Sequence, residues 1–557
     1  MGVQQIDNVS LSDSDEGLGG HCPLYAIFRT MTQHEDMALL IEELQLALVK
    51  RDVQRGFKLL DEALANLSTM KCDARHSSAL LLSLAQWTDL GYRDLPFLDA
   101  LFAQCPPGDR GQLSVLAFFE TRLAEAYRDL ASERLESCIE GIDLVLRVGE
   151  GLFSNYFLFV ANLWKCRAHR KRGEYQHALV HIIAAKEAAE RLGAPKLVAV
   201  TKIHEGWLAF QNGQVQFALQ LLDEAEVELQ PTGHALSLGN IESARGRFVR
   251  RSGQYARAIR HFQNAIDIYR SGYPEHPNLA RALVNAAYVK RLMALDMHPN
   301  KAGKQASGAT HAKIVSVRRE ALTLLAQAET IYARHEHQGG TGSVLVNAAH
   351  LHLENGDIGQ ASVEGNRAFD LGEQKNDQIL MARARNVQAM VELELSEEQL
   401  GEEPDVALHA HLAVQYSETS IALALQTQNK RLLAEAYITR GMIAASDFHQ
   451  DLEPAREYAT KATTLLSSND RDHLFNSLGT LKRKLVDATR VDENLRMWSD
   501  GQLGNKSFQQ VQEEFAELVI PKVWLSLDKN ISAVAKRLSI SPKKVRRILR
   551  NANLLSE

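Results

Sequence analysis

The stretch RGEYQHALVHIIAAKEA (residues 172–188) recurs in variant form as NGQVQFALQLLDEAEVE (212–228) and SGQYARAIRHFQNAIDI (252–268). Each copy contains an early glycine, and these three glycines, Gly173, Gly213 and Gly253, are spaced by 40 residues. At fixed intervals after each glycine come an alanine, a bulky apolar residue and a second alanine: Ala178, Ile182 and Ala185; Ala218, Leu222 and Ala225; Ala258, Phe262 and Ala265. Repetition at a fixed period of this length predicts an array of structural repeats.

The spacing within each copy predicts a hairpin of two antiparallel helices. Glycine permits the tight turn between them, because without a Cβ it adopts left-handed backbone angles readily. The two alanines of a copy fall on one helical face, where a small side chain lets the partner helix approach closely. Gly206 and Gly246 each lie seven residues before a turn glycine and predict a similar close contact on the first helix of the hairpin.

Weaker copies of the pattern extend in both directions, for example KRDVQRGFKLLDEALANL (50–67) and NGDIGQASVEGNRAFDL (355–371). We therefore expect about nine or ten hairpins, which must stack into a superhelix because a single hairpin cannot bury its apolar face. The segment HLFNSLGTLKRKLVDA (473–488) predicts a helix that caps the last hairpin. Its apolar stripe consists of Leu474, Phe475, Leu478, Leu481 and Leu485.

This pattern of turn glycines and small residues resembles the tetratricopeptide repeat, with slightly longer helices than that family has. The resemblance implies an all-α fold, a superhelix of helical hairpins. It also implies a concave surface that binds an extended peptide or a protein partner.

Composition narrows the class of protein further. The formal net charge of the 557 residues is −6, so any surface that binds nucleic acid must be local. The five cysteines are scattered and form no C-x-x-C pair, which is typical of reduced, mostly buried thiols. The N-terminal segment has no apolar core of a signal peptide, and no apolar run is long enough to span a membrane. We expect a cytoplasmic protein without a membrane partner.

The last residues of the chain differ in character from the array. Residues 530–556 contain no acidic residue and seven basic ones: Lys536, Arg537, Lys543, Lys544, Arg546, Arg547 and Arg550. Such a local positive patch on a mildly acidic protein is typical of a surface that faces phosphate groups.

The apolar pattern in this segment predicts two short helices joined by a tight turn. Ser532 is expected to cap the first helix, whose buried residues are Val534, Ala535 and Leu538. Ser541 is expected to cap the second, with Pro542 at its first position. Val545, Ile548 and Leu549 then form the buried stripe of the second helix. Together these features predict a helix-turn-helix unit.

An amphipathic helix is predicted before this pair, in SFQQVQEEFAELVI (507–520). Its expected core-facing stripe is Phe508, Val511, Phe515, Leu518 and Val519. The three helices resemble the Fis-type C-terminal DNA-binding domain over about residues 507–555. Two positions depart from that family: Ser539 stands where glycine is usual at the turn, and Pro521 is expected to interrupt the first helix.

The Fis-type resemblance implies binding of double-stranded DNA by a homodimer, since one helix-turn-helix offers little interface by itself. The residues that it places at the DNA are Ser541, Lys543, Lys544, Arg546, Arg547 and Arg550. Long cationic side chains cannot be sorted into base readers and phosphate clamps from sequence alone.

No catalytic, metal-binding or cofactor-binding pattern is recognised. The histidine pairs, such as His350 and His352, have i, i+2 spacing, which points two rings to different sides of a helix. The glycine-rich segment HQGGTGSVLV (337–346) lacks the lysine of a phosphate loop and is interpreted as a turn between repeats. We expect no enzyme activity, no cofactor and no metal.

The sequence therefore predicts four parts. Residues 1–35 are expected to be an acidic disordered segment, 36–490 the repeat array, 491–506 a linker and 507–557 the helix-turn-helix domain. The function expected for this arrangement is that of a transcriptional regulator whose array senses a peptide or protein and whose C-terminal domain binds an operator. The alternative is a non-enzymatic scaffold or adaptor that binds proteins only.

Overall fold

The computed structural model describes residues 29–31, 34–65, 70–71, 74–93, 95–103, 113–148, 153–297, 308–398, 405–466, 470–488, 497–498, 501, 506–551 and 554–555. Most of the predicted N-terminal segment 1–35 and most of the predicted linker 491–506 lie outside these residues. Residues 298–307 also lie outside them.

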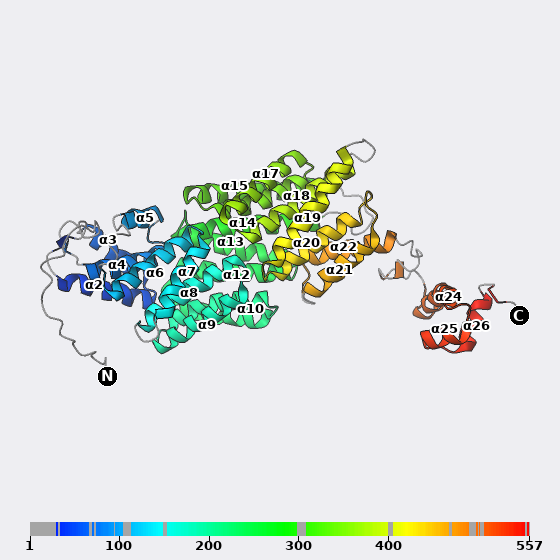
Figure 1. Ribbon diagram of the computed structural model, residues 1–557, viewed down its shortest axis with the longest axis horizontal. Coiled ribbons are helices and arrows are strands. Elements are labelled where there is room, and N and C mark those ends of the chain that lie inside the picture. Colours follow the sequence, from blue (N-terminus) through cyan, green and yellow to red (C-terminus); the bar gives the residue numbers. More distant parts are fainter. Residues whose placement is uncertain are drawn as a thin grey trace.

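The chain is built of helices that pair in order along the sequence (Figure 1). In the described residues, eight regular hairpins run from α6 to α21. Their first helices are α6 (Val115–Ala131), α8 (Asn155–Arg172), α10 (Pro195–Gln211), α12 (Ala235–Arg251), α14 (Pro277–Asp296), α16 (Gln338–Glu354), α18 (Gln378–Glu398) and α20 (Lys430–Ala444). Their second helices are α7 (Leu135–Val148), α9 (Tyr175–Arg191), α11 (Val215–Leu229), α13 (Tyr255–Gly272), α15 (Gly308–Arg334), α17 (Ile358–Lys375), α19 (Asp405–Leu425) and α21 (Leu452–Leu465). A short 3-10 helix, η3 (Gln230–Thr232), follows α11.

Four further helices precede these hairpins: α2 (His34–Lys50), α3 (Val53–Ala65), α4 (Ala74–Asp89) and α5 (Leu95–Ala103). They add two hairpins, which agrees with the predicted nine or ten. Two very short strands, β1 (Arg29–Met31) and β2 (Met70–Lys71), pair antiparallel beside them, with Arg29 opposite Lys71. This pair was not predicted, but the architecture is the expected all-α superhelix of helical hairpins.

The repeat residues occupy the positions that their spacing predicted. Gly173, Gly213 and Gly253 have φ values of 80°, 83° and 75°, the left-handed region in which a side chain is strained. The alanines of all three copies are fully buried, as are the bulky residues between them. A Cβ added to Gly246 would lie 2.9 Å from the ring of Phe262, so glycine is needed where these two helices cross.

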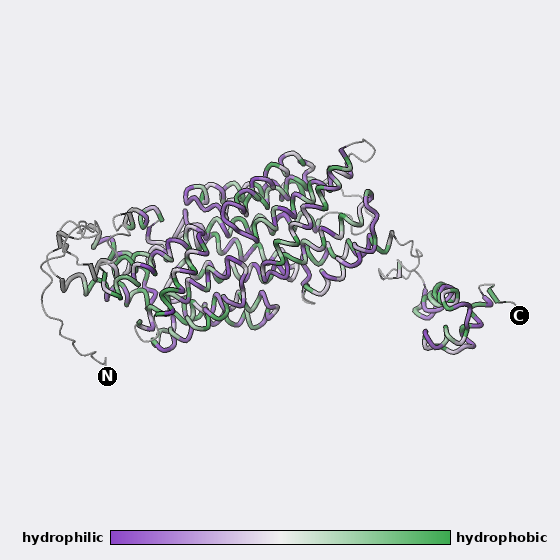
Figure 2. The backbone as a smooth tube through the Cα atoms, in the orientation of Figure 1, coloured by the Kyte–Doolittle hydropathy of each residue, from purple (hydrophilic) through white to green (hydrophobic). Residues whose placement is uncertain are grey.

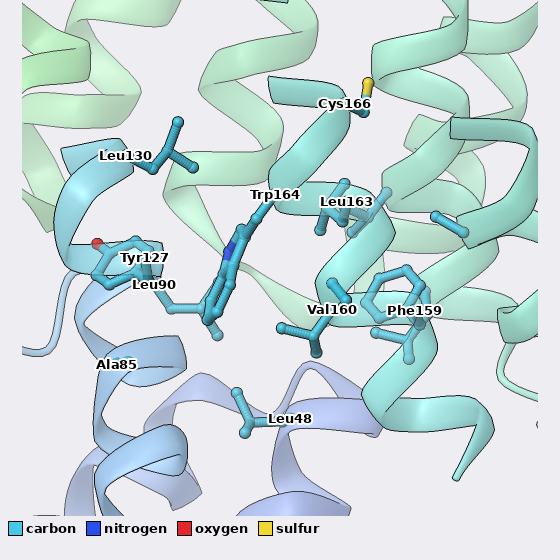
Figure 3. Packing of buried hydrophobic residues seen from close by; sticks show 14 of the residues in the cluster. Leu48, Ala85, Leu90, Tyr127, Leu130, Phe159, Val160, Leu163, Trp164 and Cys166 are labelled. Atoms are coloured by element: carbon cyan, nitrogen blue, oxygen red, sulfur yellow. The ribbon is translucent and has the colours of Figure 1, made fainter. Parts of the chain in front are cut away.

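The first part of the array is held by a continuous aromatic and aliphatic core. Tyr127 of α6 and Trp164 of α8 face each other there, with ring centroids 5.0 Å apart (Figure 3). Along the helices of the array, hydrophobic and hydrophilic residues alternate over short distances (Figure 2). Within the described part of the chain, no helix is long and apolar enough to cross a membrane.

Segments far apart in the sequence also touch, because the superhelix winds far enough for one turn to reach the next. At the α8–α9 turn, the Gly173 carbonyl accepts a 3.0 Å hydrogen bond from the Gln428 N–H, and Gln428 Oε1 accepts from the Gln176 N–H at 2.7 Å. At the α6–α7 turn, Glu133 Oε2 accepts a 2.7 Å hydrogen bond from the Gly339 N–H. These contacts close the wall of the superhelix between its turns.

The last helix of the array, α22 (His473–Ala488), has the predicted bounds. Leu478, Leu481 and Leu485 are buried as predicted, and Leu474 packs against them. The prediction for Phe475 was wrong, since its ring is exposed and lies beneath the Arg471 guanidinium instead.

The interpretation of Gly339, Gly340 and Gly342 as a turn between repeats was also wrong. All three lie in α16, near its N-terminus. A Cβ on Gly340 would lie 2.5 Å from the Tyr332 ring, and one on Gly342 would lie 2.3 Å from Leu380. These glycines therefore permit close helix packing rather than a turn.

Candidate functional site

The C-terminal unit consists of α24 (Phe508–Ser526), α25 (Ile531–Leu538) and α26 (Pro542–Asn551). The three helices share a small core of their own, made of Ile520, Trp524, Val534, Ala535, Val545, Ile548 and Leu549. Every predicted buried residue of the second helix, α26, lies in this core. The unit is therefore a compact three-helix domain in which α25 and α26 meet at a tight turn.

Capping residues set the geometry of that turn. Ser539 ends α25 in the left-handed region, and the Ile540 N–H donates a 3.1 Å hydrogen bond to the Ala535 carbonyl. Ser541 Oγ accepts from the Lys544 N–H at 3.2 Å and caps α26, as predicted. The prediction that Ser532 caps α25 was wrong: Asn530 Oδ1 accepts from the Ala533 N–H, because the helix begins two residues earlier.

The first helix of the unit differs from the prediction in two ways. Pro521 does not interrupt it, because α24 continues through the proline and loses only the hydrogen bond that the missing N–H would make. The predicted stripe does not form the core either, since Phe508 and Phe515 are 77% and 48% exposed. The core-facing residues of α24 are Ile520 and Trp524.

The predicted DNA-binding residues lie on the exposed side of α26 and at its N-terminus. The side chains of Lys543, Arg546 and Arg550 are exposed, Lys544 is half-buried, and none of these four is in an ion pair within the described residues. Arg547 is exposed but lies 3.1 Å from the Glu513 carboxylate of α24. The buried stripe and the cationic residues thus occupy opposite sides of one helix.

A second candidate site lies inside the array. The first helices of successive hairpins line a cavity of about 1300 Å³. This is larger than the roughly 300–1000 Å³ of an ordinary small-molecule site. Arg167 and Arg170 come from α8, Trp207 from α10 and Arg247 from α12. We call this cavity the chamber.

Basic side chains greatly outnumber acidic ones in the lining of the chamber. Among the described residues, thirteen lysines and arginines line it, against six aspartates and glutamates. The cations are Arg51, Arg134, Arg167, Arg170, Lys171, Arg172, Arg247, Arg250, Arg281, Arg291, Lys375, Arg383 and Arg431. The chain as a whole carries a net charge of −6, so this positive lining is a local property.

Ion pairs neutralise part of this charge. Arg167 Nη1 donates to both carboxylate oxygens of Asp89, at 2.7 and 2.5 Å. Burial by itself raises the pKa of Asp89, but the charge and hydrogen bonds of Arg167 outweigh burial and lower the pKa on balance. Arg291 likewise pairs with Glu354 at 2.5 Å.

Histidines in the chamber wall are held neutral. Burial, together with the charges of nearby arginines, lowers the pKa of His234 and of His276 to about 3. Burial also lowers the pKa of His204 well below its usual range, and Arg170 acts in the same direction. These neutral rings therefore add no positive charge to the chamber.

Sequence reasoning did not find the chamber, because a concave face cannot be distinguished without knowing how the hairpins wind. One signal was present in the repeat register. Arg247 and Trp207 directly follow the close-contact glycines Gly246 and Gly206, and both line the chamber.

The structure also brings together His169, Glu174 and His177, whose potential ligand atoms lie within 4.8 Å of one another. The sequence analysis did not single out this group, because its spacing matches no helical metal motif. Glu174 is already engaged by His169 Nδ1 at 2.6 Å and by Arg172 at 3.0 Å. The group is therefore a hydrogen-bonded cluster at the α8–α9 turn.

Fold and sites together define a helical-repeat protein with a basic chamber and a small C-terminal three-helix unit. No protein-family model matches the chain, and neither does any curated protein.

Solved structures of low similarity do exist. The chain is similar to a Rap protein complexed with competence and sporulation factor, at 13% identity and a TM-score of 0.46, over 82% of this chain and 99% of that one. It is similar to the apo form of the quorum sensor NprR from B. thuringiensis, at 13% identity and a TM-score of 0.44, over 69% of this chain and 99% of that one. It is also similar to the human IFIT1 dimer with m7Gppp-AAAA, at 13% identity and a TM-score of 0.40, over 80% of this chain and 94% of that one. At these identities and TM-scores, the likenesses assign neither a family nor a function to this chain.

Proposed function

We propose that this protein is a DNA-binding transcriptional regulator whose C-terminal unit is a Fis-type helix-turn-helix. The observation that carries the proposal is the arrangement of α26. Its apolar side is buried against α24 and α25, while Lys543, Arg546 and Arg550 are exposed and free of ion pairs within the described residues. A short helix that presents unpaired cations in this way suits the major groove and its flanking phosphates.

The exposed stripe of α24 supports a homodimer. Phe508, Val511, Phe515 and Leu518 follow the three- and four-residue spacing of a helix pair. Both phenylalanines are exposed, and Val511 and Leu518 are half-buried. A second copy of α24 would bury this stripe. Two helix-turn-helix units then bind two half-sites, which gives the affinity that one unit lacks.

The repeat array would receive the signal that this regulator senses. Repeat arrays bind extended partners along their concave surfaces, so a peptide or protein is the input that the architecture favours. The chamber supplies such a concave surface. The protein would act in the cytoplasm by binding alone, without catalysis, a cofactor or a metal.

The test is a fluorescence-anisotropy titration of the full-length protein with random duplex DNA at two salt concentrations. We expect binding that weakens steeply as salt rises, because each neutralised phosphate releases counterions. We expect the combined substitution of Lys543, Lys544, Arg546 and Arg547 by Ala to abolish it. Undiminished binding by that variant would overturn the assignment of the interface. No binding by the natural chain would favour the alternative, a scaffold or adaptor that binds proteins only.

A further inference from the structure

Several arginines of the chamber have no carboxylate partner. Within the described residues, none of Arg170, Arg247 and Arg281 is in an ion pair. Arg170 lies 3.3 Å from His204 Nδ1 and stacks over Trp207, and Arg247 donates hydrogen bonds to the carbonyl and hydroxyl of Ser243. Neutral groups thus hold guanidinium groups whose charge the protein leaves uncompensated.

Arg281 of α14 is held in the same manner. Its Nη2 donates to Asn240 Oδ1 at 3.0 Å and to Asn278 Oδ1 at 2.8 Å, and both acceptors are neutral amides. Its buried Nε has no hydrogen-bond partner, and the same is true of Arg51 and Arg250. Buried donors without partners are costly, and a ligand with several acceptor atoms in the chamber would satisfy these three.

The unpaired cations also act on one another, which shows that they converge. Burial, together with repulsion from Arg281, lowers the pKa of Arg170 to about 10 and that of Arg247 to about 9. Lys171 and His276 respond to Arg281 as well. Cations from α8 and α12 therefore line the same chamber as Arg281 of α14 and lie close enough to Arg281 to repel it.

Cations this close together favour a ligand whose negative charges are also close together. An extended acidic peptide carries its carboxylates at intervals of about 3.3 Å along the chain, on alternating sides. Linked phosphate groups concentrate charge within a few ångströms and offer many acceptor oxygens. The planar guanidinium group also matches phosphate oxygens in a two-point arrangement.

We propose that the chamber binds a small ligand that carries two or more linked phosphate groups, held by Arg170, Arg247 and Arg281. The proposal goes beyond the function proposed above, because it puts a small phosphorylated ligand in the place of the peptide or protein input named there. Binding of the ligand to the chamber does not depend on that function. Only an effect of the ligand on DNA binding would rest on it. A peptide input is the competing outcome.

Isothermal titration calorimetry of the full-length protein with inorganic tripolyphosphate and with ATP tests the proposal. A hexa-aspartate peptide serves as the competing probe. We expect at least one phosphate probe to bind more tightly than the peptide. The variant with Lys543, Lys544, Arg546 and Arg550 replaced by Ala should keep this binding, since the α26 cations lie outside the chamber.

Substitution of the chamber arginines provides the second arm. Arg247→Met and Arg281→Met should each weaken phosphate binding at least tenfold, while exposed Arg257→Met on α13 should leave it unchanged. Removing an uncompensated charge should also keep or raise the thermal midpoint of unfolding, which separates loss of the site from loss of the fold.

Three results would overturn the proposal: no binding of either phosphate probe, tighter binding of hexa-aspartate, or full phosphate binding by both chamber variants. The titrations contain no DNA, so this failure is distinct from failure of the regulator function. Binding of tripolyphosphate without binding of duplex DNA would support the chamber site and contradict the regulator function. Binding of duplex DNA without binding of either phosphate probe would support only the regulator function.

Discussion

Arg251 and Asp470 form a buried ion pair that joins two turns of the superhelix, although 219 residues separate them in the sequence. Arg251 ends α12, and Asp470 precedes α22. Their side chains are 9% and 2% exposed. The Arg471 N–H donates to the Arg251 carbonyl at 3.1 Å and extends the contact to the backbone. This junction joins the end of α12 to the segment before α22, and its contribution to stability can be measured.

Removal of the Arg251 side chain should weaken the array substantially. The change Arg251→Ala removes one cation from buried Asp470, which Arg431 also contacts at 2.9 Å. Because Arg431 still compensates the Asp470 charge, the loss is that of the hydrogen bonds from Arg251, and we expect a decrease of about 2 kcal/mol in the free energy of unfolding in urea. The exposed Arg257→Ala should change it by less than about 0.5 kcal/mol. Equal stabilities for the two variants would contradict the role of the junction.

Two repeat-equivalent glycines should respond differently to alanine. Gly213 and Gly253 have similar positive φ angles, so each substitution costs about 1 kcal/mol in backbone strain. A Cβ at Gly253 would lie only 2.5 Å from the Arg471 carbonyl oxygen, whereas nothing lies within 4 Å of a Cβ at Gly213. We expect Gly253→Ala to destabilise more than Gly213→Ala.

Hydrogen exchange locates the effect of these two variants. Exchange at the Arg471 amide should accelerate in Gly253→Ala, because that amide bonds to Arg251 across the junction. It should be unchanged in Gly213→Ala. Acceleration in both variants would show that the general stability of the hairpin, and not the junction, controls this amide.

Acid should destabilise the array through its buried histidines. Burial lowers the pKa of His234 to about 3 from an ordinary value of 6.5. Between these values the unfolded chain binds the proton and the folded chain does not. Stability is therefore complete above about pH 6.5 and falls as the pH decreases, by up to about 1.4 kcal/mol per pH unit for each such group.

The variant His234→Gln isolates one of these groups. It should lose less stability than the natural chain between about pH 6.5 and pH 5, as judged by urea unfolding at each pH. The exposed His311→Gln should follow the natural chain. A variant His234→Gln with an unchanged pH dependence would show that His234 is not held neutral in the fold.

The salt dependence of DNA binding should report how many cations of α26 contact DNA. Replacing Lys543, Lys544, Arg546 and Arg550 by Ala should lower the slope of log K against log salt by about 3 to 4. The matched control replaces four exposed arginines of the array, Arg257, Arg260, Arg319 and Arg367, and should keep the slope. Equal slopes for both variants would place the DNA interface elsewhere.

The exposed stripe of α24 should control assembly. Phe515→Glu puts a charge into the expected dimer contact without touching the core around Trp524. We expect the dimer dissociation constant to increase on the order of a hundredfold in sedimentation equilibrium. Phe217→Glu, at a similarly exposed phenylalanine of α11, should leave it unchanged. A natural chain that sediments as a monomer at all concentrations would contradict the dimer.

Several elements could be predicted from the sequence because they depend on neighbours within one hairpin. The turn at Gly173 and the buried alanines follow from local spacing. The core residues Val545 and Ile548 of α26 follow from helical periodicity over a single short segment. The apolar stripe of α24 was detected by the same reasoning, but it was wrongly assigned to the core of the C-terminal unit. Amphipathic spacing shows that Phe508 and Phe515 share a face, but not what that face meets.

The sequence by itself determined the helical hairpins, their order and the helix pair at the C-terminus, since each is governed by contacts within about 40 residues. Only the tertiary structure decided which residues line the chamber and which distant turns touch. A small rotation from each hairpin to the next accumulates along the array, and no local pattern encodes its sum. That accumulated rotation brings Asp470 to Arg251 and gathers Arg170, Arg247 and Arg281 around one cavity.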